Sequence, residues 1–107
     1  MTEGGKRLDE GKLRWDLLPI PPIEELIKVY THGATKYEPW NWYKGLKYSR
    51  VYAPLMRHVT TWWKGESIDK EFGLNHMAHV AWNAITLLTY ELEKRTDLDD
   101  RIKEATK

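Results

Sequence analysis

Apolar positions recur with a helical period in three stretches of the chain. Each stretch is expected to form a helix. Residues 22 to about 33 carry apolar side chains at positions i, i+3, i+4 and i+7, from Ile23 to Tyr30. Pro22 suits a first helical turn, and Gly33 favours a left-handed end. A second helix is expected over residues 49–64, with Ser49 as its cap. Its apolar stripe comprises Val51, Tyr52, Leu55, Met56, Val59, Trp62 and Trp63.

The third stretch, residues 75 to about 95, carries two stripes. The apolar one comprises Met77, Ala78, Ala81, Ala84, Ile85, Leu88 and Leu92. At about 100° per residue, a polar stripe falls on the same side of the helix. It comprises His76, His79, Asn83, Thr86 and Tyr90. A helix that is apolar over most of its circumference is expected at the centre of the domain. Its polar side chains then need a partner helix or a ligand.

The remaining segments connect or flank these helices. Residues 34–48 are expected as a long loop rich in Tyr and Trp, and residues 65–74 as an acidic loop. Residues 12–22 contain three prolines and are expected as an extended arm that docks on the body. The sequence therefore predicts an all-α domain over residues 12–95 with a three-helix core. Residues 1–11 are expected to be a flexible N-terminus, and residues 96–107 a polar tail, either a short exposed helix or frayed.

The amino-acid composition of the chain excludes several classes of protein and of site. The chain has 107 residues, with 17 Lys and Arg against 16 Asp and Glu. A net charge of +1 argues against a dedicated nucleic-acid or membrane-surface binder. The absence of cysteine excludes disulfides and thiolate metal sites. No apolar run reaches the roughly 18 residues of a membrane helix, and the N-terminus is polar without a secretion signal. We therefore expect a cytoplasmic location.

Aromatic residues are unusually frequent. Six Trp, six Tyr and one Phe exceed what the core of so small a domain can hide. Each single ring can still be a bulky core filler. As a set, however, they predict that some rings line a pocket or a subunit interface. We therefore expect a homodimer or higher oligomer, with a site between subunits as one arrangement.

Histidine and carboxylate residues gather around the expected second loop. His76 and His79 are three residues apart, so both project from one face of the third helix. His58 lies on the preceding helix, opposite them if the two helices pair. The candidate metal ligands are His58, His76 and His79, and the candidate catalytic carboxylates are Glu66, Asp69 and Glu71. The alternative is that these histidines are core or interface groups bonded to the backbone.

A second group of residues combines positive charge with aromatic rings and amides. Lys and Arg hold phosphates, and Trp or Tyr stack on bases. The candidate substrate-binding residues are Lys36, Tyr37, Asn41, Trp42, Lys44, Arg57 and Asn83. An ordinary solvated basic face with core aromatics is the alternative. The chain has no phosphate-binding GxxxxGK[ST] or GxGxxG pattern, no adjacent His-Asp pair, and few candidate nucleophiles.

Three blocks of sequence carry a family resemblance. They are LRWDLLP (13–19), VYTHGATKYEPWNWYKG (29–45) and MRHVTTWWKGESIDKEFGLNHMAHVAWNAI (56–85). In this order they closely resemble the phage and bacterial dATP/dGTP diphosphohydrolase N-terminal domain family, over roughly residues 12 to 92. The resemblance implies hydrolysis of a purine deoxynucleoside triphosphate to the monophosphate and pyrophosphate. In some phages this activity serves a nucleotide pool in which 2-aminoadenine replaces adenine.

The family also looks distantly similar to the MazG-type all-α pyrophosphohydrolases, which carry an E-x-x-D pair at the start of a central helix. In this chain His76 and His79 occupy the comparable place, which departs from a Mg²⁺–carboxylate site. Imidazole suits Mn²⁺, Co²⁺ or Zn²⁺ better than Mg²⁺. The expected cofactor is thus a divalent metal, one of Mn²⁺, Co²⁺, Mg²⁺ or Zn²⁺. Three other functions stay open: a nucleotide binder without turnover, a Trp-rich protein-interaction module, and a domain with a structural zinc.

Overall fold

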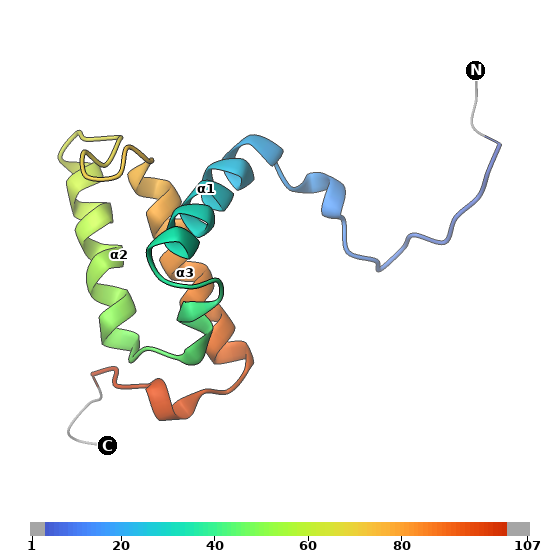
Figure 1. Cartoon of the computed structure of the whole chain (residues 1–107). Coiled ribbons are helices and arrows are strands. Elements are labelled where there is room, and N and C mark those ends of the chain that lie inside the picture. The colour runs from blue at the N-terminus through green and yellow to red at the C-terminus, as the bar shows by residue number, and fades with distance from the viewer. Residues whose placement is uncertain (1–3, 103–107) are drawn as a thin grey trace.

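The protein is all-α. The computed structural model describes residues 4–102, and it contains three helices and three short 3₁₀ segments. The helices are α1 (Ile20–Lys36), α2 (Tyr48–Trp63) and α3 (His76–Leu92) (Figure 1). The 3₁₀ segments are η1 (Trp15–Leu17), η2 (Asn41–Lys44) and η3 (Thr96–Leu98). The prediction of an all-α fold with three helices is therefore confirmed.

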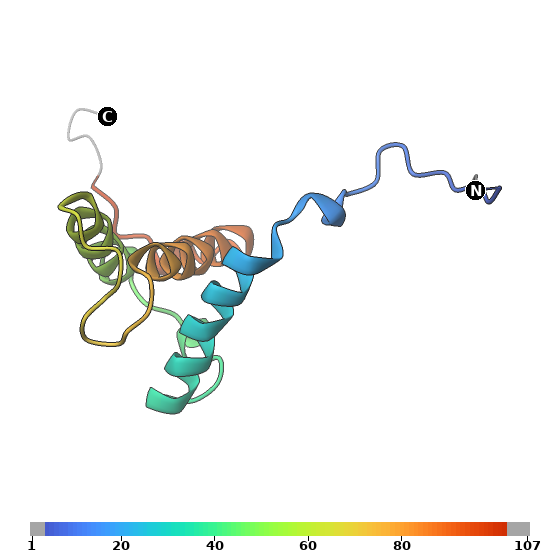
Figure 2. The ribbon, with the colours of Figure 1, turned by 90° about the horizontal axis from the view of Figure 1, so that it is seen from above.

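The α2 and α3 helices form an antiparallel pair joined by the 65–74 loop, and α1 packs against α3 at an angle (Figures 1 and 2). Leu26 and Val29 are the buried residues of α1. At the end of the pair away from the 65–74 loop, a compact core is formed by Tyr48, Val51, Tyr90 and Leu98. The two ends of the α2–α3 pair therefore differ, since one is apolar and the other carries the loop with the carboxylates.

Three of the expected helix ends are corrected by the structure. The α1 helix begins at Ile20, two residues earlier than expected, because Pro21 and Pro22 occupy first-turn positions where no backbone N–H is needed. It also continues past Gly33 to Lys36, since Gly33 keeps a helical conformation and its carbonyl accepts from the N–H of Tyr37. The α2 helix starts and ends within one residue of the prediction. The α3 helix stops at Leu92, and Lys94 then adopts a positive φ of 56°.

The start of α2 is held by the C-terminal segment instead of by a cap of its own. Lys47 is the N-cap residue and makes no side-chain hydrogen bond to the helix. Ser49, expected as the cap, lies in the first turn, and its N–H and hydroxyl both donate to Asp100. Leu98 enters the core. Residues 97–101 therefore contact the domain, where a polar tail with a short exposed helix or a frayed end was expected. Ile102 is fully exposed, and residues 103–107 of that tail lie outside the described part.

The arm before α1 does not dock on its own chain, contrary to the prediction. It runs away from the helices (Figures 1 and 2), and Leu13, Trp15 and Leu17 are 80%, 76% and 69% exposed. The arm instead makes local contacts, such as the two hydrogen bonds from the Arg14 guanidinium to Asp16. Residues 1–3 of the expected flexible N-terminus lie outside the described part. In residues 4–102 no helix is both long and apolar enough to span a bilayer.

Candidate functional site

The 65–74 loop places a carboxylate over the start of α3. Gly65, with φ of 109°, lets the chain turn sharply after α2. The loop then closes through hydrogen bonds from the N–H of Asp69 to the carbonyl of Leu74 (2.8 Å) and from the N–H of Gly73 to the carbonyl of Asp69 (2.7 Å). Asp69 Oδ1 accepts the backbone N–H of Glu71 at 2.8 Å. These contacts fix the Asp69 carboxylate in a buried position, 8% exposed.

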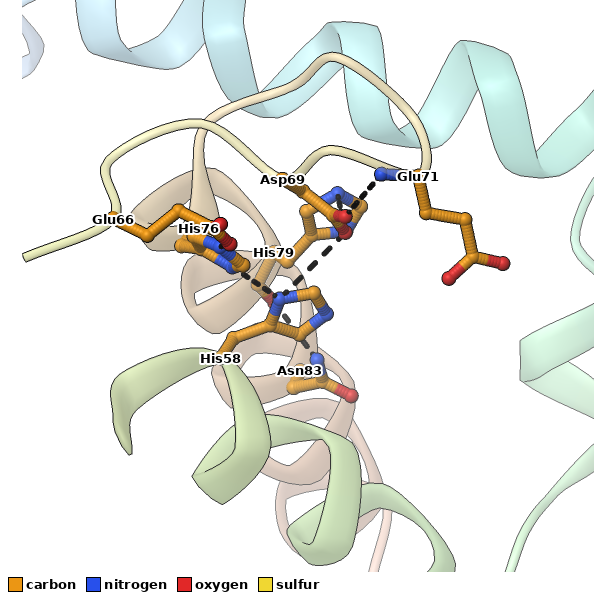
Figure 3. Close-up of polar contacts among 7 residues, drawn as sticks. All are labelled: His58, Glu66, Asp69, Glu71, His76, His79 and Asn83. Carbon is orange, nitrogen blue, oxygen red and sulfur yellow. Dashed lines mark hydrogen bonds and ion pairs between the residues drawn. The ribbon is translucent and has the colours of Figure 1, made fainter. Parts of the chain in front are cut away.

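Asp69 meets two histidines from different helices. Its Oδ2 lies 4.0 Å from His58 Nδ1 on α2 and 3.7 Å from His79 Nε2 on α3 (Figure 3). The two imidazole rings are parallel, with centroids 4.3 Å apart. One ligand atom from each of the three residues lies within 4.8 Å of the others. We call these three residues the His58–Asp69–His79 cluster.

The two imidazoles of this cluster are in the state that binds metal. Burial, with a smaller repulsive contribution from His79, lowers the pKa of His58 from 6.5 to about 4. Burial also lowers the pKa of His79. Both rings are therefore neutral at physiological pH and keep a lone pair free for a ligand. His79 Nε2 is buried and has no hydrogen-bond partner among residues 4–102. Two imidazole nitrogens and one carboxylate are a donor set that fits a divalent metal.

His76 links the cluster to a second carboxylate. Its Nε2 lies 2.6 Å from Glu66 Oε2, and its Nδ1 lies 2.9 Å from His58 Nδ1 (Figure 3). The hydrogen bond with His76 lowers the pKa of Glu66, so this carboxylate stays ionised at neutral pH. A carboxylate that holds an imidazole beside a cluster of ligands fixes the orientation of the ring. His76 is thus engaged with Glu66 and His58 on the edge of the cluster.

Two further candidates lie beside the cluster without joining it. Glu71 contributes its backbone N–H to Asp69, while its own carboxylate is exposed and points away (Figure 3). Asn83 is buried one turn below His79, and its Nδ2 donates to the His79 carbonyl at 2.8 Å. Asn83 therefore holds the helix backbone under the site.

The candidate phosphate- and base-binding residues divide into two places. Lys36 and Tyr37 lie at the end of α1, where Lys36 Nζ is 5.3 Å from the ring centroid of Phe72 in the 65–74 loop. Arg57 is exposed beside His58. Asn41, Trp42 and Lys44 belong to η2, at the other end of α3.

The η2 segment is fixed at that other end by the core. The Trp42 carbonyl accepts the Tyr90 hydroxyl, and Lys44 pairs with Glu38. Tyr90 lies about 16 Å along α3 from His79, at 1.5 Å per residue. The structure thus brings Lys36 and Arg57 toward the cluster and leaves Asn41, Trp42 and Lys44 outside it.

Two residues near the cluster were missed by the sequence analysis. His32 of α1 and Phe72 of the loop have ring centroids 4.7 Å apart, and Phe72 lies 5.9 Å from the His79 ring. His32 and Lys36 are one helical turn apart and therefore share a face. The sequence analysis ended this helix at Gly33 and placed Lys36 in a loop, so it did not predict that His32 and Lys36 share a helix face.

Comparison with known proteins agrees with this description. The sequence pattern of the family described as "dATP/dGTP diphosphohydrolase, N-terminal" matches residues 2–101. The dATP/dGTP diphosphohydrolase of Salmonella phage PMBT28 is 35% identical over 97 residues, which cover 91% of this chain and 33% of that relative. The chain thus spans about a third of the length of the relative. No solved structure matches significantly. The family resemblance is confirmed, and the chain belongs to the dATP/dGTP diphosphohydrolase N-terminal family.

Proposed function

We propose that this protein hydrolyses purine deoxynucleoside triphosphates, dATP or dGTP, to the monophosphate and pyrophosphate. The observation that carries the proposal is the His58–Asp69–His79 cluster with the Glu66–His76 pair at its edge. Membership of the family and the name of the phage relative support the substrate class. The proposed place of action is the cytoplasm, where deoxynucleotide pools are maintained, and the host cytoplasm if a phage encodes the chain.

The proposed cofactor is a divalent metal held by His58, Asp69 and His79. Such an ion, when bound, supplies Lewis-acid activation of a phosphate oxygen and of a water. The two neutral imidazoles favour Mn²⁺, Co²⁺ or Zn²⁺ over Mg²⁺. His76 orients His58 through the contact between their Nδ1 atoms, and Glu66 holds His76 in turn.

The remaining residues supply the proton acceptor and the positive charge. A water oxygen attacks the α-phosphorus, and the bond from that phosphorus to the bridging oxygen of pyrophosphate breaks. Of the three loop carboxylates, Asp69 belongs to the cluster and Glu71 points away, which leaves Glu66 to accept the water proton. Three cations are proposed to neutralise phosphate oxygens: Lys70, whose Nζ lies 3.5 Å from Glu66 Oε1, Lys36 beside Phe72, and Arg57 next to His58.

A product analysis tests this proposal. The chain would be incubated with dATP, dGTP, dCTP and dTTP, each with Mg²⁺, Mn²⁺ or Co²⁺, and the products resolved by ion-exchange chromatography. We expect monophosphate and pyrophosphate from the purine substrates, and a loss of turnover in Asp69→Asn. Asp97→Asn, a matched change at an exposed aspartate paired with Arg95, should keep full activity. Nucleotide binding without turnover under any metal would instead favour a binding protein.

We also propose that the chain forms a homodimer through α3. Its outer stripe is apolar and exposed, with Leu88 53% and Leu92 73% accessible. From His76 to Tyr90 the helix carries no Asp, Glu, Lys or Arg, so two copies can meet there without like-charge repulsion. Ala81 and Ala84 lie among the large residues of the stripe and permit a close helix approach. These features favour a second copy of the chain as the partner.

A further inference from the structure

A groove separates α1 from the 65–74 loop, directly beside the His58–Asp69–His79 cluster. Its volume is about 330 Å³. Its walls include Ile27, Thr31, His32 and Thr35 of α1 and Phe72 and Leu74 of the loop. Figure 3 shows α1 passing over the loop that carries Asp69 and Glu71. The groove is thus lined by apolar side chains, two threonines, one imidazole and one cation, Lys28.

One ring nitrogen of His32, Nε2, is buried and lacks a hydrogen-bond partner among residues 4–102. A buried ring nitrogen of this kind is normally paired, because its desolvation is otherwise uncompensated. The ring is held edge-on to Phe72, with centroids 4.7 Å apart and planes at 60°. Rotation of the His32 ring would bring this buried nitrogen to the groove, so that a ligand there meets an aromatic surface and a hydrogen-bonding atom side by side.

Phe72 connects this groove to the cluster. Its ring centroid lies 5.9 Å from that of His79 on one side and 4.7 Å from that of His32 on the other. Lys36 Nζ lies 5.3 Å from the same ring. A molecule with a phosphate chain at the cluster can therefore place a planar group against Phe72, with Lys36 close to both parts.

We propose that this groove is the subsite for the purine base of the nucleotide, with Phe72 as the stacking surface and His32 as the hydrogen-bonding group. The choice of a purine rests on the proposed function. The placement itself rests on the groove, the unpaired Nε2 of His32 and the position of Phe72. This assignment differs from the expectation that Trp42 or Trp62 stacks on the base; Trp42 is held through its carbonyl by Tyr90, far along α3 from His79.

Equilibrium binding tests the assignment separately from turnover. Calorimetry with Mn²⁺ would compare the α,β-methylene analogue of dGTP, which resists cleavage at the proposed position, with inorganic triphosphate. The wild-type chain should bind the nucleotide about tenfold or more tightly than triphosphate, as expected for one stacked base. Phe72→Leu and His32→Ala should reduce that difference to about twofold, with triphosphate binding unchanged. Trp40→Leu, at an exposed ring outside the groove, should keep the wild-type difference.

A variant that fills the groove tests the assignment even if Phe72→Leu or His32→Ala fails to fold. Thr31 is exposed on α1, so Thr31→Phe occupies the groove without disturbing buried residues. It should remove the preference for the nucleotide as Phe72→Leu does. The assignment is overturned if the wild-type chain binds both ligands equally or binds neither, or if all three groove variants keep the preference. Failure of the proposed hydrolysis would appear independently, as intact dGTP after incubation with a wild-type chain that still shows the binding difference.

Discussion

At the scale of residues, the site depends on the burial of two imidazoles beside a carboxylate. His58 and His79 lie between two helices and under a loop, and burial is the largest cause of the lowered pKa of each. Asp69 is the anion that the loop brings to them. The cluster is therefore costly to form without a cation, and this has measurable consequences for stability and for metal binding.

The first prediction concerns acid stability without metal. The pKa of His58 is about 4 in the folded chain and 6.5 as a free side chain, so the folded state binds fewer protons between these values. Stability is then greatest above pH 6.5 and falls as the pH drops from 6.5 toward 4. Urea unfolding in EDTA across this range should show that loss, and His58→Gln should show a shallower one. An equal slope in both proteins would contradict the lowered pKa of His58.

The second prediction concerns metal affinity. Asp69→Asn keeps the oxygen that accepts the Glu71 N–H but removes the charge that faces His58 and His79. We expect its affinity for Co²⁺ or Mn²⁺ to fall at least about 100-fold, while its secondary structure is retained. Calorimetric titration measures the affinity, and Asp97→Asn provides the matched control. Unchanged Co²⁺ binding in Asp69→Asn would remove Asp69 from the ligand set.

Sequence spacing predicted that the three histidines lie together, but not which carboxylate faces them. His76 and His79 were placed on one face by their three-residue separation, and His58 opposite them by the pairing of α2 with α3. Burial and loop geometry, which no spacing encodes, then decide that Asp69 faces His79 while the Glu71 carboxylate does not. The site residues themselves remain predictions until the variants above are measured.

At the scale of elements, helix existence was predictable and helix ends were not. The apolar period locates all three helices, including α2 despite Pro54 inside it. The ends depend on contacts that are distant in sequence. Asp100, for example, satisfies the first turn of α2 from about 50 residues away. The local capping patterns at Ser49 and Gly33 therefore lie within a few residues of real helix ends. However, Ser49 is not the cap of α2, and α1 does not end at Gly33.

The third prediction concerns the contact that holds η2 against α3. Tyr90 is 1% exposed, and its hydroxyl donates to the Trp42 carbonyl. Tyr90→Phe removes this hydrogen bond and keeps the ring, so we expect a loss of about 1 kcal/mol in the free energy of unfolding. Tyr90→Ala also leaves a cavity in the core and should cost about 3–5 kcal/mol. Denaturant unfolding measures both. Since Tyr90 is remote from the cluster, neither metal affinity nor nucleotide preference should change in Tyr90→Phe.

At the scale of the whole molecule, α3 shows an inverted distribution of side chains. Its buried residues include His76, His79 and Asn83, while the large apolar residues of its other face are exposed. The sequence analysis expected both stripes on one side and the apolar one in the core. Within one chain the polar stripe forms the inside, because α1, α2 and the 65–74 loop all converge on it. The apolar stripe is left exposed in a single copy, which is the basis of the proposed dimer.

The last prediction follows from this exposed stripe. Leu88 belongs to this stripe and is 53% exposed, so Leu88→Glu would place carboxylates in the proposed interface between copies of α3 without disturbing the fold of one chain. Light scattering should give the wild-type chain twice the 12.7 kDa mass of one copy, and Leu88→Glu the mass of one. Leu8→Glu, the same change at a 94% exposed arm residue, should stay dimeric. Because the cluster lies on the opposite face of α3, the monomeric variant should still bind Co²⁺. A wild-type chain that is already monomeric would contradict the proposed dimer.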